Sequence, residues 1–305
     1  MTTEQLSSLL LVDPKAVLEN DRRLYFKQIE QAAKVIAANA KTRPIVLLAG
    51  PSGSGKTTTA LLIERELKRM GIVTHTLQMD DYFCPLTPTE LELLKENKLD
   101  LEKPTRVDIP YFQEHLDRIL ACEPFELPRY DFKSSSRVFE GKMLHRKPGE
   151  LVIIEGIHAL NPDVTGHADS TTRIYVSVRT RITAKDGQVL HPSKIRLARR
   201  LLRDRTGRGR KLTETIGMRD RVDHGEQLYI MPYKDLAHYS IDSFYSTELS
   251  VYRPYLFEDL KPLVPEYPDL ADLVHIFTEM PDVPSQCVPT DSLLREFIGG
   301  SELNY

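Results

Sequence analysis

Long apolar runs alternate along this chain with segments whose apolar residues recur at helical spacing. Residues 45–50, IVLLAG, and residues 151–156, LVIIEG, are apolar without interruption. Such runs are typical of parallel strands that helices cover on both faces. Residues 73–80, 172–178 and 238–244 are further strand candidates, and residues 22–40 and 57–71 are predicted helices. The alternation predicts an α/β fold with a doubly wound parallel sheet.

Composition narrows the possible functions only slightly. The chain has 305 residues, 41% of them hydrophobic, and a formal net charge of −3. These values are those of a globular protein with no overall attraction to nucleic acid or anionic membranes. Three widely spaced cysteines disfavour a disulfide framework, and no apolar run is long enough for a signal peptide or a membrane span. We therefore expect a cytoplasmic protein.

A glycine-rich loop lies between the first strand and its following helix. Residues 50–57, GPSGSGKT, match the phosphate-loop pattern G-x-x-x-x-G-K-[ST] at each fixed position. Lys56 is predicted to reach the β- and γ-phosphate oxygens, and the Thr57 hydroxyl to bind Mg²⁺. The flanking strand and helix disfavour a chance glycine-rich turn. The predicted ATP-binding residues here are Gly50, Ser52, Gly53, Ser54, Gly55, Lys56, Thr57 and Thr58.

Two acidic sites suggest which phosphate chemistry the loop serves. We expect neither the Asn-Lys-x-Asp segment through which a GTPase reads guanine nor the serine-glycine-glycine signature of an ABC-type ATPase, and therefore neither of these two classes. Asp80 ends the second strand at the edge where ligands of such sheets bind, so it could accept a hydroxyl proton. Asp81 is expected to point the other way. Glu155 could hold Mg²⁺. The alternatives are a solvated strand end for Asp80 and Asp81, and a turn cap for Glu155.

A strongly basic segment follows later in the chain. Residues 194–211 contain nine Lys or Arg against a single acid, Asp204. Four arginines, Arg196, Arg199, Arg200 and Arg203, share one face of the predicted helix. Such a face could close over a triphosphate as a lid, lie in solvent, or bind RNA. The absence of aromatic residues from this segment weakens the RNA interpretation.

Taken together, the motifs resemble those of the uridine kinase and phosphoribulokinase-like family. The resemblance covers about residues 22–300, and its matching stretches are GPSGSGKTT, MDDYF, RYDFKSSSR, VIIEGIHALNP, RLARRLLRDRTGRGR and MPYKDLAHYSID. The segments TIGMRDRVDHGEQLYIMPYK and SLLREFIGGS are most similar to a bacterial uridine kinase-like branch often fused to a TGS domain. No TGS domain is expected here, because few residues precede the phosphate loop.

This resemblance implies a role for individual residues. Asp80 would be the catalytic carboxylate, with Lys56 and Arg203 beside the phosphoryl group, and Thr57, Glu155 and Asp80 would form the Mg²⁺ shell. Arg208 would join the ATP-binding set. The implied acceptor-binding residues are Asp80, Asp108, Tyr130, Arg137, Arg200, Arg203 and Arg210, with Asp108 on the ribose hydroxyls.

Two positions depart from the family pattern. Ser135 stands where uridine–cytidine kinases carry a base-reading histidine, and Met218 stands where they carry a glutamine. Neither replacement offers the same hydrogen bonds, so the preferred base does not follow from the sequence.

The predicted organisation is a P-loop kinase domain with additions. We expect an N-terminal helical segment (1–43), the kinase domain (44–260) with a substrate-side insertion (84–150) and a helical lid region (191–235), and a C-terminal extension packed on the core (261–305). The predicted activity is ATP- and Mg²⁺-dependent phosphorylation of a nucleoside 5′-hydroxyl. The alternatives are a kinase for another hydroxyl, such as that of a sugar phosphate or a pantothenate-like molecule, and a nucleotide-binding RNA-associated regulator. By analogy with related kinases, a homo-oligomer is also expected.

Overall fold

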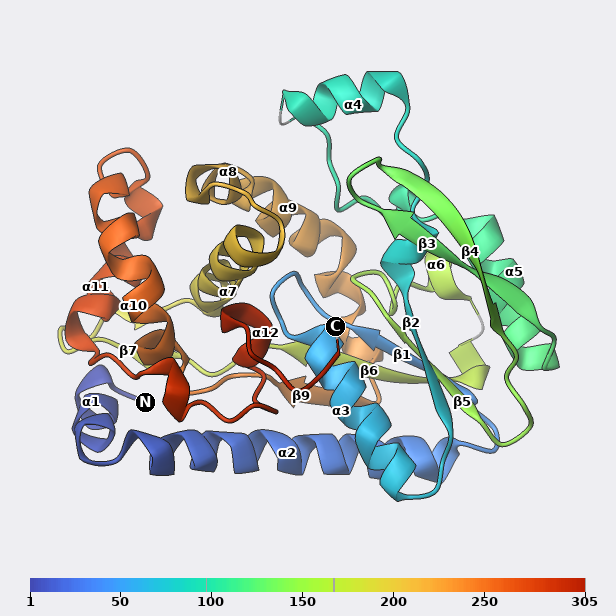
Figure 1. Cartoon of the computed structure of the whole chain (residues 1–305), viewed down its shortest axis with the longest axis horizontal. Helices are drawn as coiled ribbons and strands as arrows, with labels where there is room; N and C mark the ends of the chain where they lie inside the picture. The colour runs from blue at the N-terminus through green and yellow to red at the C-terminus, as the bar shows by residue number, and fades with distance from the viewer. Residues whose placement is uncertain (97, 167, 305) are drawn as a thin grey trace.

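The computed structural model describes residues 1–96, 98–166 and 168–304. At its centre is a parallel sheet whose five strands follow the order β2 (Thr74–Gln78), β5 (Leu151–Glu155), β1 (Ile45–Ala49), β6 (Thr171–Ser177) and β9 (Tyr239–Asp242) (Figure 1). Two antiparallel pairs lie outside it, β3 (Phe125–Asp131) with β4 (Ser136–Leu144) and β7 (Ile182–Thr183) with β8 (Val189–Leu190). The predicted parallel α/β sheet is confirmed.

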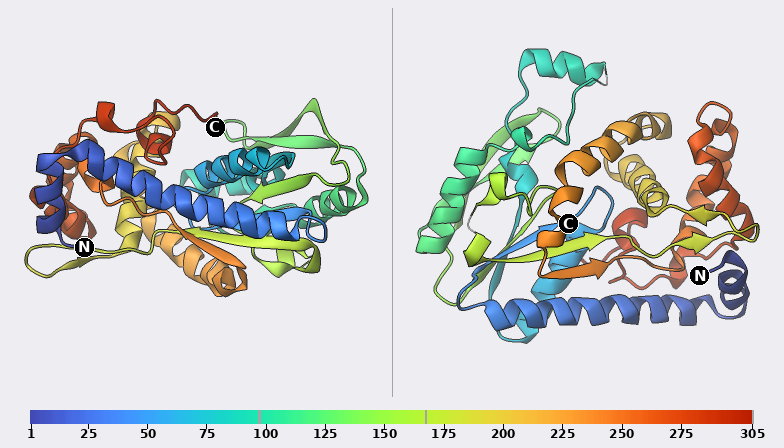
Figure 2. Two further views of the ribbon diagram at one scale, coloured as in Figure 1. Left: turned by 90° about the horizontal axis from the view of Figure 1, so that it is seen from below. Right: turned by 180° about the vertical axis from the view of Figure 1, so that it is seen from behind.

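The helices cover the two faces of the sheet, and some of them lie beyond its edges. Their bounds are α1 (Thr3–Val12), α2 (Pro14–Asn39), α3 (Lys56–Arg69), α4 (Pro88–Lys95), α5 (Ile109–Ala121), α6 (Pro162–Thr165), α7 (Pro192–Gly207), α8 (Leu212–Gly217), α9 (Arg219–Tyr229), α10 (Glu248–Leu260), α11 (Ala271–Glu279) and α12 (Arg295–Ile298). In Figures 1 and 2, α2 extends along one whole side of the molecule, and α4 projects from the opposite side.

Two hydrophobic cores lie on opposite faces of the sheet. Val46 and Leu48 of β1 face the larger core, which includes residues of α2, α3, α7, α10 and α11, whereas Ile45 and Leu47 face the smaller core beneath α5 and α6. Successive residues of a strand point to opposite faces, so an uninterrupted apolar run supplies both cores. This is why β1 is apolar at each position.

The long helix α2 begins earlier than its apolar spacing predicted, at Pro14 rather than residue 22. The Asp13 side chain accepts a hydrogen bond from the Ala16 N–H at 3.0 Å, and Pro14 occupies the first turn, where its missing N–H costs nothing. Tyr25 and Ile29 bury the same face further along. The capping residues thus extend the helix beyond the apolar repeat.

The second strand ends earlier than predicted, at Gln78 rather than residue 80. Residues Met79–Tyr82 form the 3₁₀ helix η1. Both Met79 and Tyr82 are buried in the smaller core, and the Tyr82 hydroxyl lies 3.0 Å from Nδ1 of His115. A 3₁₀ helix has three residues per turn, so it brings residues 79 and 82 onto one face. Strand alternation therefore does not set the directions of the intervening acids.

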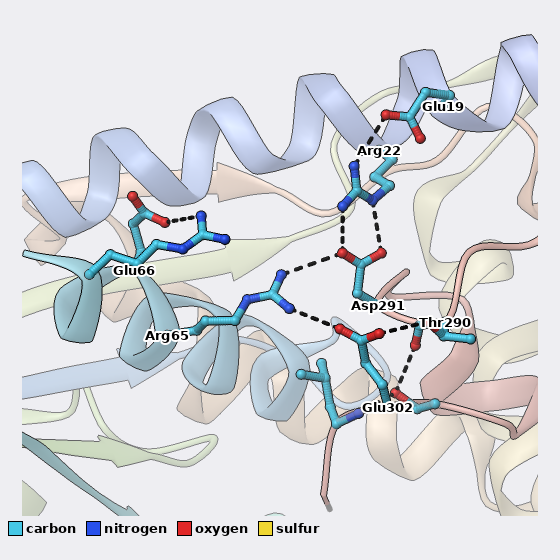
Figure 3. A network of polar contacts seen from close by, with 10 residues as sticks. Glu19, Arg22, Arg65, Glu66, Thr290, Asp291 and Glu302 are labelled. Atoms are coloured by element: carbon cyan, nitrogen blue, oxygen red, sulfur yellow. Dashed lines mark hydrogen bonds and ion pairs between the residues drawn. The ribbon is translucent and has the colours of Figure 1, made fainter.

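The C-terminal residues pack against the centre of the molecule. Leu293, Leu294 and Phe297 belong to the larger core. Ion pairs connect the same segment to α2 and α3 (Figure 3). Arg22 of α2 lies 2.5 Å from the Asp291 carboxylate, and Arg65 of α3 lies 3.5 Å from the same carboxylate. The network joins three parts of the chain that are distant in sequence.

Replacing Asp291 with asparagine is expected to lower the free energy of unfolding by about 1–2 kcal/mol at pH 7, because the amide cannot form the ion pairs. Burial opposes ionisation of Asp291, but the hydrogen bonds and charges of Arg22 and Arg65 outweigh it and hold the pKa below its ordinary value of 3.8. A depressed pKa stabilises the fold above the unfolded-state value, and this stability is lost as pH falls through the folded-state value.

Urea unfolding of the wild type and Asp291→Asn at pH 7 and below pH 4 measures this effect, and the difference should shrink at the lower pH. An equal difference at both pH values would contradict the assignment. Glu19→Gln serves as the control, because Glu19 is 61% exposed where it meets Arg22. We expect it to change stability by less than about 0.5 kcal/mol.

In the described part of the chain, no helix combines the length and apolarity needed to cross a bilayer. Within the described residues, Cys84, Cys122 and Cys287 form no disulfide.

Candidate active site

The loop between β1 and α3 has the backbone shape that phosphate binding requires. Gly53 and Gly55 have φ values of 77° and 83°, in the left-handed region that glycine adopts readily. At Gly50, a Cβ would lie 2.0 Å from the backbone oxygen of Val176 on β6, so no side chain fits. The helix α3 begins at Lys56, which directs its partial positive charge at the loop.

A cavity of about 960 Å³ opens beside this loop. Predicted site residues that line it are Ser52, Gly53, Gly55, Lys56, Thr57, Asp80, Tyr130, Glu155, Arg200, Arg203, Arg208 and Arg210. Predicted residues that do not line it are Gly50, Ser54, Thr58, Asp108 and Arg137. The cavity therefore gathers residues from the phosphate loop, the ends of β2 and β5, the β3–β4 hairpin and α7.

Thr57 and Glu155 meet at one end of this cavity. The Thr57 hydroxyl donates a hydrogen bond to Oε1 of Glu155 at 2.9 Å. Glu155 ends β5 directly opposite Gln78 of β2, and burial raises its pKa to about 7 although Lys56 opposes the shift. A hydroxyl and a carboxylate are oxygen ligands of the kind Mg²⁺ prefers, and Mg²⁺ in nucleotide sites takes its other ligands from phosphates and water. These two residues fit the predicted metal shell.

The adjacent acids Asp80 and Asp81 have different surroundings. Asp80 lines the cavity, and burial raises its pKa, while the charges of Lys56, Arg208 and Arg203 oppose the rise. Asp81 instead accepts a hydrogen bond from the Tyr130 N–H at 3.1 Å and so holds the β3–β4 hairpin. The two acids diverge as predicted, but the turn of η1 rather than strand alternation separates them.

The arginines that share one face of α7 fall into two groups. Arg196 pairs with Glu226 at 2.7 Å, and Arg199 is completely buried against Glu248, with a hydrogen bond to the Gly53 carbonyl oxygen at 3.2 Å. Arg200 is also buried, but it lines the cavity. Burial of these side chains contradicts a solvated basic face. Arg196 and Arg199 support the loop from behind, and Arg200 faces the ligand space.

Beyond Arg200, three arginines surround the acid Asp204. Arg203 lies 3.4 Å from the Ser52 hydroxyl, and Arg208 and Arg210 lie 3.4 and 3.7 Å from the Asp204 carboxylate. The Arg208 and Arg210 backbone N–H groups also donate to the Asp204 carbonyl oxygen. The single acid of the basic segment therefore shapes the RGR turn at the cavity edge.

Asp108 and Arg137 lie outside the cavity lining and contact each other. Asp108 caps α5 by accepting from the Tyr111 N–H at 3.4 Å, and it pairs with Arg137 at 3.1 Å. Arg137 also donates to the carbonyl oxygens of Tyr82 and Phe83. The pair links β4, η1 and α5, which is a different position from the one that the resemblance implied.

Several further charged residues line the cavity although the sequence did not predict them as site residues, among them Glu102, Arg106 and Glu296. Arg106 donates to the Cys84 carbonyl oxygen at 2.7 Å, and Glu296 accepts a hydrogen bond from the Thr58 hydroxyl. Glu296 belongs to the SLLREFIGGS segment, whose likeness to the family was visible but whose place beside the phosphate loop was not. No local pattern marks Glu102.

An Asn-Lys-x-Asp sequence nonetheless occurs at residues 97–100, contrary to the expectation that the chain has no such segment. Asn97 lies outside the described residues. The Asp100 carboxylate accepts hydrogen bonds from the Glu102 N–H at 3.0 Å and the Tyr229 hydroxyl at 3.4 Å. Asp100 thus takes part in packing between this segment and α9.

The two positions that depart from the family pattern also line the cavity. Ser135 has a φ of 52°, and its carbonyl oxygen accepts from the Leu86 N–H at 3.1 Å. Met218 lines the cavity from the junction of α8 and α9. The residues that differ from uridine–cytidine kinases therefore face the ligand space.

Comparison with known proteins identifies related sequences. The pattern described as "Phosphoribulokinase / Uridine kinase family" matches residues 45–250. The uridine kinase of Lactobacillus helveticus is 31% identical over 176 residues, which cover 57% of this chain and 74% of that protein. The uridine kinase of Lactiplantibacillus plantarum is 28% identical over 180 residues, 59% of this chain and 77% of that protein.

Among solved structures, the D-glycerate 3-kinase of Cryptococcus neoformans is 16% identical, with a TM-score of 0.47. The match covers 67% of this chain and 88% of that one.

Proposed function

Because the chain belongs to the phosphoribulokinase/uridine kinase family, we propose that it transfers the γ-phosphoryl group of ATP to the 5′-hydroxyl of a nucleoside. The observation that carries this proposal is the single cavity that Lys56, Asp80 and Arg203 share. Phosphoryl transfer to a hydroxyl needs a phosphate-binding group, a carboxylate and a further cation, and here all three line the same cavity. The names of the relatives support a nucleoside as the acceptor.

In this mechanism the donor lies along the phosphate loop. The loop N–H groups and Lys56 bind the β- and γ-phosphates, and Thr57 and Glu155 would hold Mg²⁺, which neutralises phosphate charge when bound. Asp80 accepts the proton of the acceptor hydroxyl while the oxygen of that hydroxyl forms a bond to the γ-phosphorus. The bond from that phosphorus to the bridging oxygen breaks, and ADP leaves.

The arginines supply positive charge around the transferring group. Arg200 and Arg203 come from α7, which is fixed in the larger core, and Arg208 and Arg210 come from the exposed turn after it. We assign lid movement to residues 207–211 rather than to α7 or α8, because moving either helix would expose residues of the larger core. Closure of this turn would exclude water from the phosphoryl group.

The acceptor end of the cavity is compatible with a planar ring. Phe83, Tyr130 and Phe132 line it, and Arg208 lies over the Phe132 ring at 5.9 Å. Such surfaces stack with a nucleobase. Ser135 and Met218 replace the residues that read pyrimidines in relatives, so we expect weak discrimination among bases.

Labelled ATP and a panel of acceptors test the proposed function. The panel contains uridine, cytidine, adenosine, ribulose 5-phosphate, glycerate and pantothenate. We expect labelled nucleoside 5′-monophosphates as products. The rates for the different nucleosides should differ by less than about 100-fold, because Ser135 and Met218 replace the side chains that hydrogen-bond the base in relatives. 5′-Deoxyuridine, which lacks the reacting hydroxyl, should inhibit competitively without being phosphorylated. Phosphorylation of a non-nucleoside alone would overturn the proposal.

A further inference from the structure

Arg173 is a charged residue within the buried parallel sheet. It belongs to β6, which pairs with β1 on one side and with β9 on the other, and the other residues of that strand are all buried. The Nε atom of Arg173 is shielded from solvent and has no hydrogen-bond partner within residues 1–96, 98–166 and 168–304. A shielded N–H group without an acceptor costs free energy, so an arginine at this position calls for a physical reason.

Other arginines with shielded side chains in this protein pair with a carboxylate. Arg196 lies 2.7 Å from Glu226, and Arg199 lies 2.7 Å from Glu248. In the part of the chain that the structure describes, Arg173 forms no ion pair of this kind. The fold therefore leaves the positive charge of Arg173 available to an anion.

Two further side chains meet Arg173 at the surface. Nη2 of Arg173 lies 3.3 Å from Nε2 of His238, and Nη1 of Arg43 lies 3.1 Å from the same atom. Nδ1 of His238 accepts a hydrogen bond from the Arg173 backbone N–H at 2.9 Å. A neutral imidazole has one acceptor nitrogen and one N–H group, so this bond places the ring proton on Nε2. Three N–H donors therefore converge, and none of them can accept a hydrogen bond from another.

The charges of this cluster favour an anion that carries more than one negative charge. Partial burial and the charges of Arg173 and Arg43 lower the pKa of His238. Among the described residues, Arg43 also forms no ion pair with a carboxylate. Guanidinium groups bind phosphate through their paired N–H donors. A phosphate dianion matches two arginine charges and has an oxygen for each donor, whereas a carboxylate has one charge and two oxygens.

The cluster lies at the edge of the sheet opposite the candidate active site. Arg43 precedes β1 and His238 precedes β9, whereas the phosphate loop follows the carboxyl end of β1. The strands β1, β6 and β9 are parallel, so their amino ends share the edge that faces away from the phosphate loop. A ligand of this cluster is therefore separate from the donor and the acceptor of the proposed mechanism.

We propose that Arg43, Arg173 and His238 form a second anion site, which binds a phosphate group. The ligand is inorganic phosphate or the phosphoryl group of a small phosphate monoester. The two arginines neutralise its charge, and the imidazole N–H donates to a third oxygen. The site takes no part in phosphoryl transfer, so this inference does not depend on the identity of the acceptor.

Isothermal titration calorimetry with inorganic phosphate tests the site in the full-length protein. Saturating Mg²⁺ and adenylyl imidodiphosphate, an ATP analogue that does not transfer its phosphoryl group, occupy the phosphate loop during the titration. We expect saturable binding to the wild type. The Kd should rise about tenfold in Arg43→Gln and in Arg173→Gln, because each variant loses hydrogen bonds between charged groups. In Arg43→Gln, kcat/KM for phosphoryl transfer should remain at the wild-type value.

Two control variants separate this site from the general effect of charge. Lys41→Gln removes an exposed charge two residues before Arg43, and Arg208→Gln removes a charge from the candidate active site. Each should change the Kd for phosphate by less than about twofold, because solvent and salt screen distant charges. If Arg173→Gln does not fold, His238→Ala replaces it, since His238 is exposed. That variant should also raise the Kd about tenfold.

Methyl phosphate and dimethyl phosphate distinguish the sources of the phosphate group. Tighter binding of methyl phosphate than of inorganic phosphate would identify a monoester as the ligand, and otherwise inorganic phosphate is the ligand. Dimethyl phosphate carries a single charge and should bind more weakly than either. Equal Kd values for phosphate in the wild type, Arg43→Gln and the second cluster variant would overturn the proposal. It would also be overturned by the lack of saturable binding, or by loss of binding in Arg208→Gln.

Discussion

Replacing Asp80 with asparagine is expected to lower kcat by about 10²–10⁴-fold while leaving the Kd for ATP within about twofold of the wild type. The loss is the usual contribution of a positioned general base, because the amide cannot take the hydroxyl proton. Nucleotide binding should persist because the phosphate loop and the Thr57–Glu155 pair are untouched. Steady-state ADP release gives kcat, and titration with a fluorescent ATP analogue gives Kd.

The neighbouring acid provides a matched control for this result. Asp81→Asn retains an oxygen that can accept from the Tyr130 N–H, so kcat should change by less than about fivefold. If Asp81→Asn were the more damaging variant, the acceptor would approach from the side of the β3–β4 hairpin. The assignment of Asp80 as the base would then be wrong.

Replacing Arg199 with methionine is expected to destabilise the protein by about 3–5 kcal/mol, the usual cost of breaking a buried ion pair. The Arg199 and Glu248 side chains are both fully buried, and their closest atoms are 2.7 Å apart. Without Arg199, the Glu248 carboxylate would stay buried with no opposing charge. The Gly53 carbonyl oxygen would also lose a donor, so the phosphate loop should bind ATP more weakly.

Urea unfolding measures the stability part of this prediction, and two further variants interpret it. The double variant Arg199→Met/Glu248→Leu removes both charges and should regain most of the lost stability. Arg205→Met lies on the same helix, but its partner Asp259 is half exposed, so a change below about 1 kcal/mol is expected. An Arg199→Met protein as stable as the wild type would show that the pair contributes no net stability.

Much of the central fold could be predicted from the sequence because its signals are local. The apolar runs at 45–50 and 151–156 predict strands that are buried on both faces, and this prediction does not depend on which other strands they pair with. The end of β2 could not be predicted in this way. Met79 and Tyr82 form a 3₁₀ turn because both pack into the smaller core, and strand periodicity carries no information about that core.

The residues of the candidate site also fall into those that local sequence predicts and those that only the packing of distant segments decides. The sequence by itself determined the phosphate loop, since the glycines, Lys56 and Thr57 are contiguous and their spacing fixes the backbone that binds phosphate. Only the tertiary structure decided which acids beyond it face the ligand. Asp108 and Glu102 are equally acidic in the sequence, but Asp108 pairs with Arg137 and caps α5, whereas Oε2 of Glu102 is shielded and has no hydrogen-bond partner among the described residues. The partners that neutralise a carboxylate come from distant segments, so its availability for a ligand depends on how those segments pack.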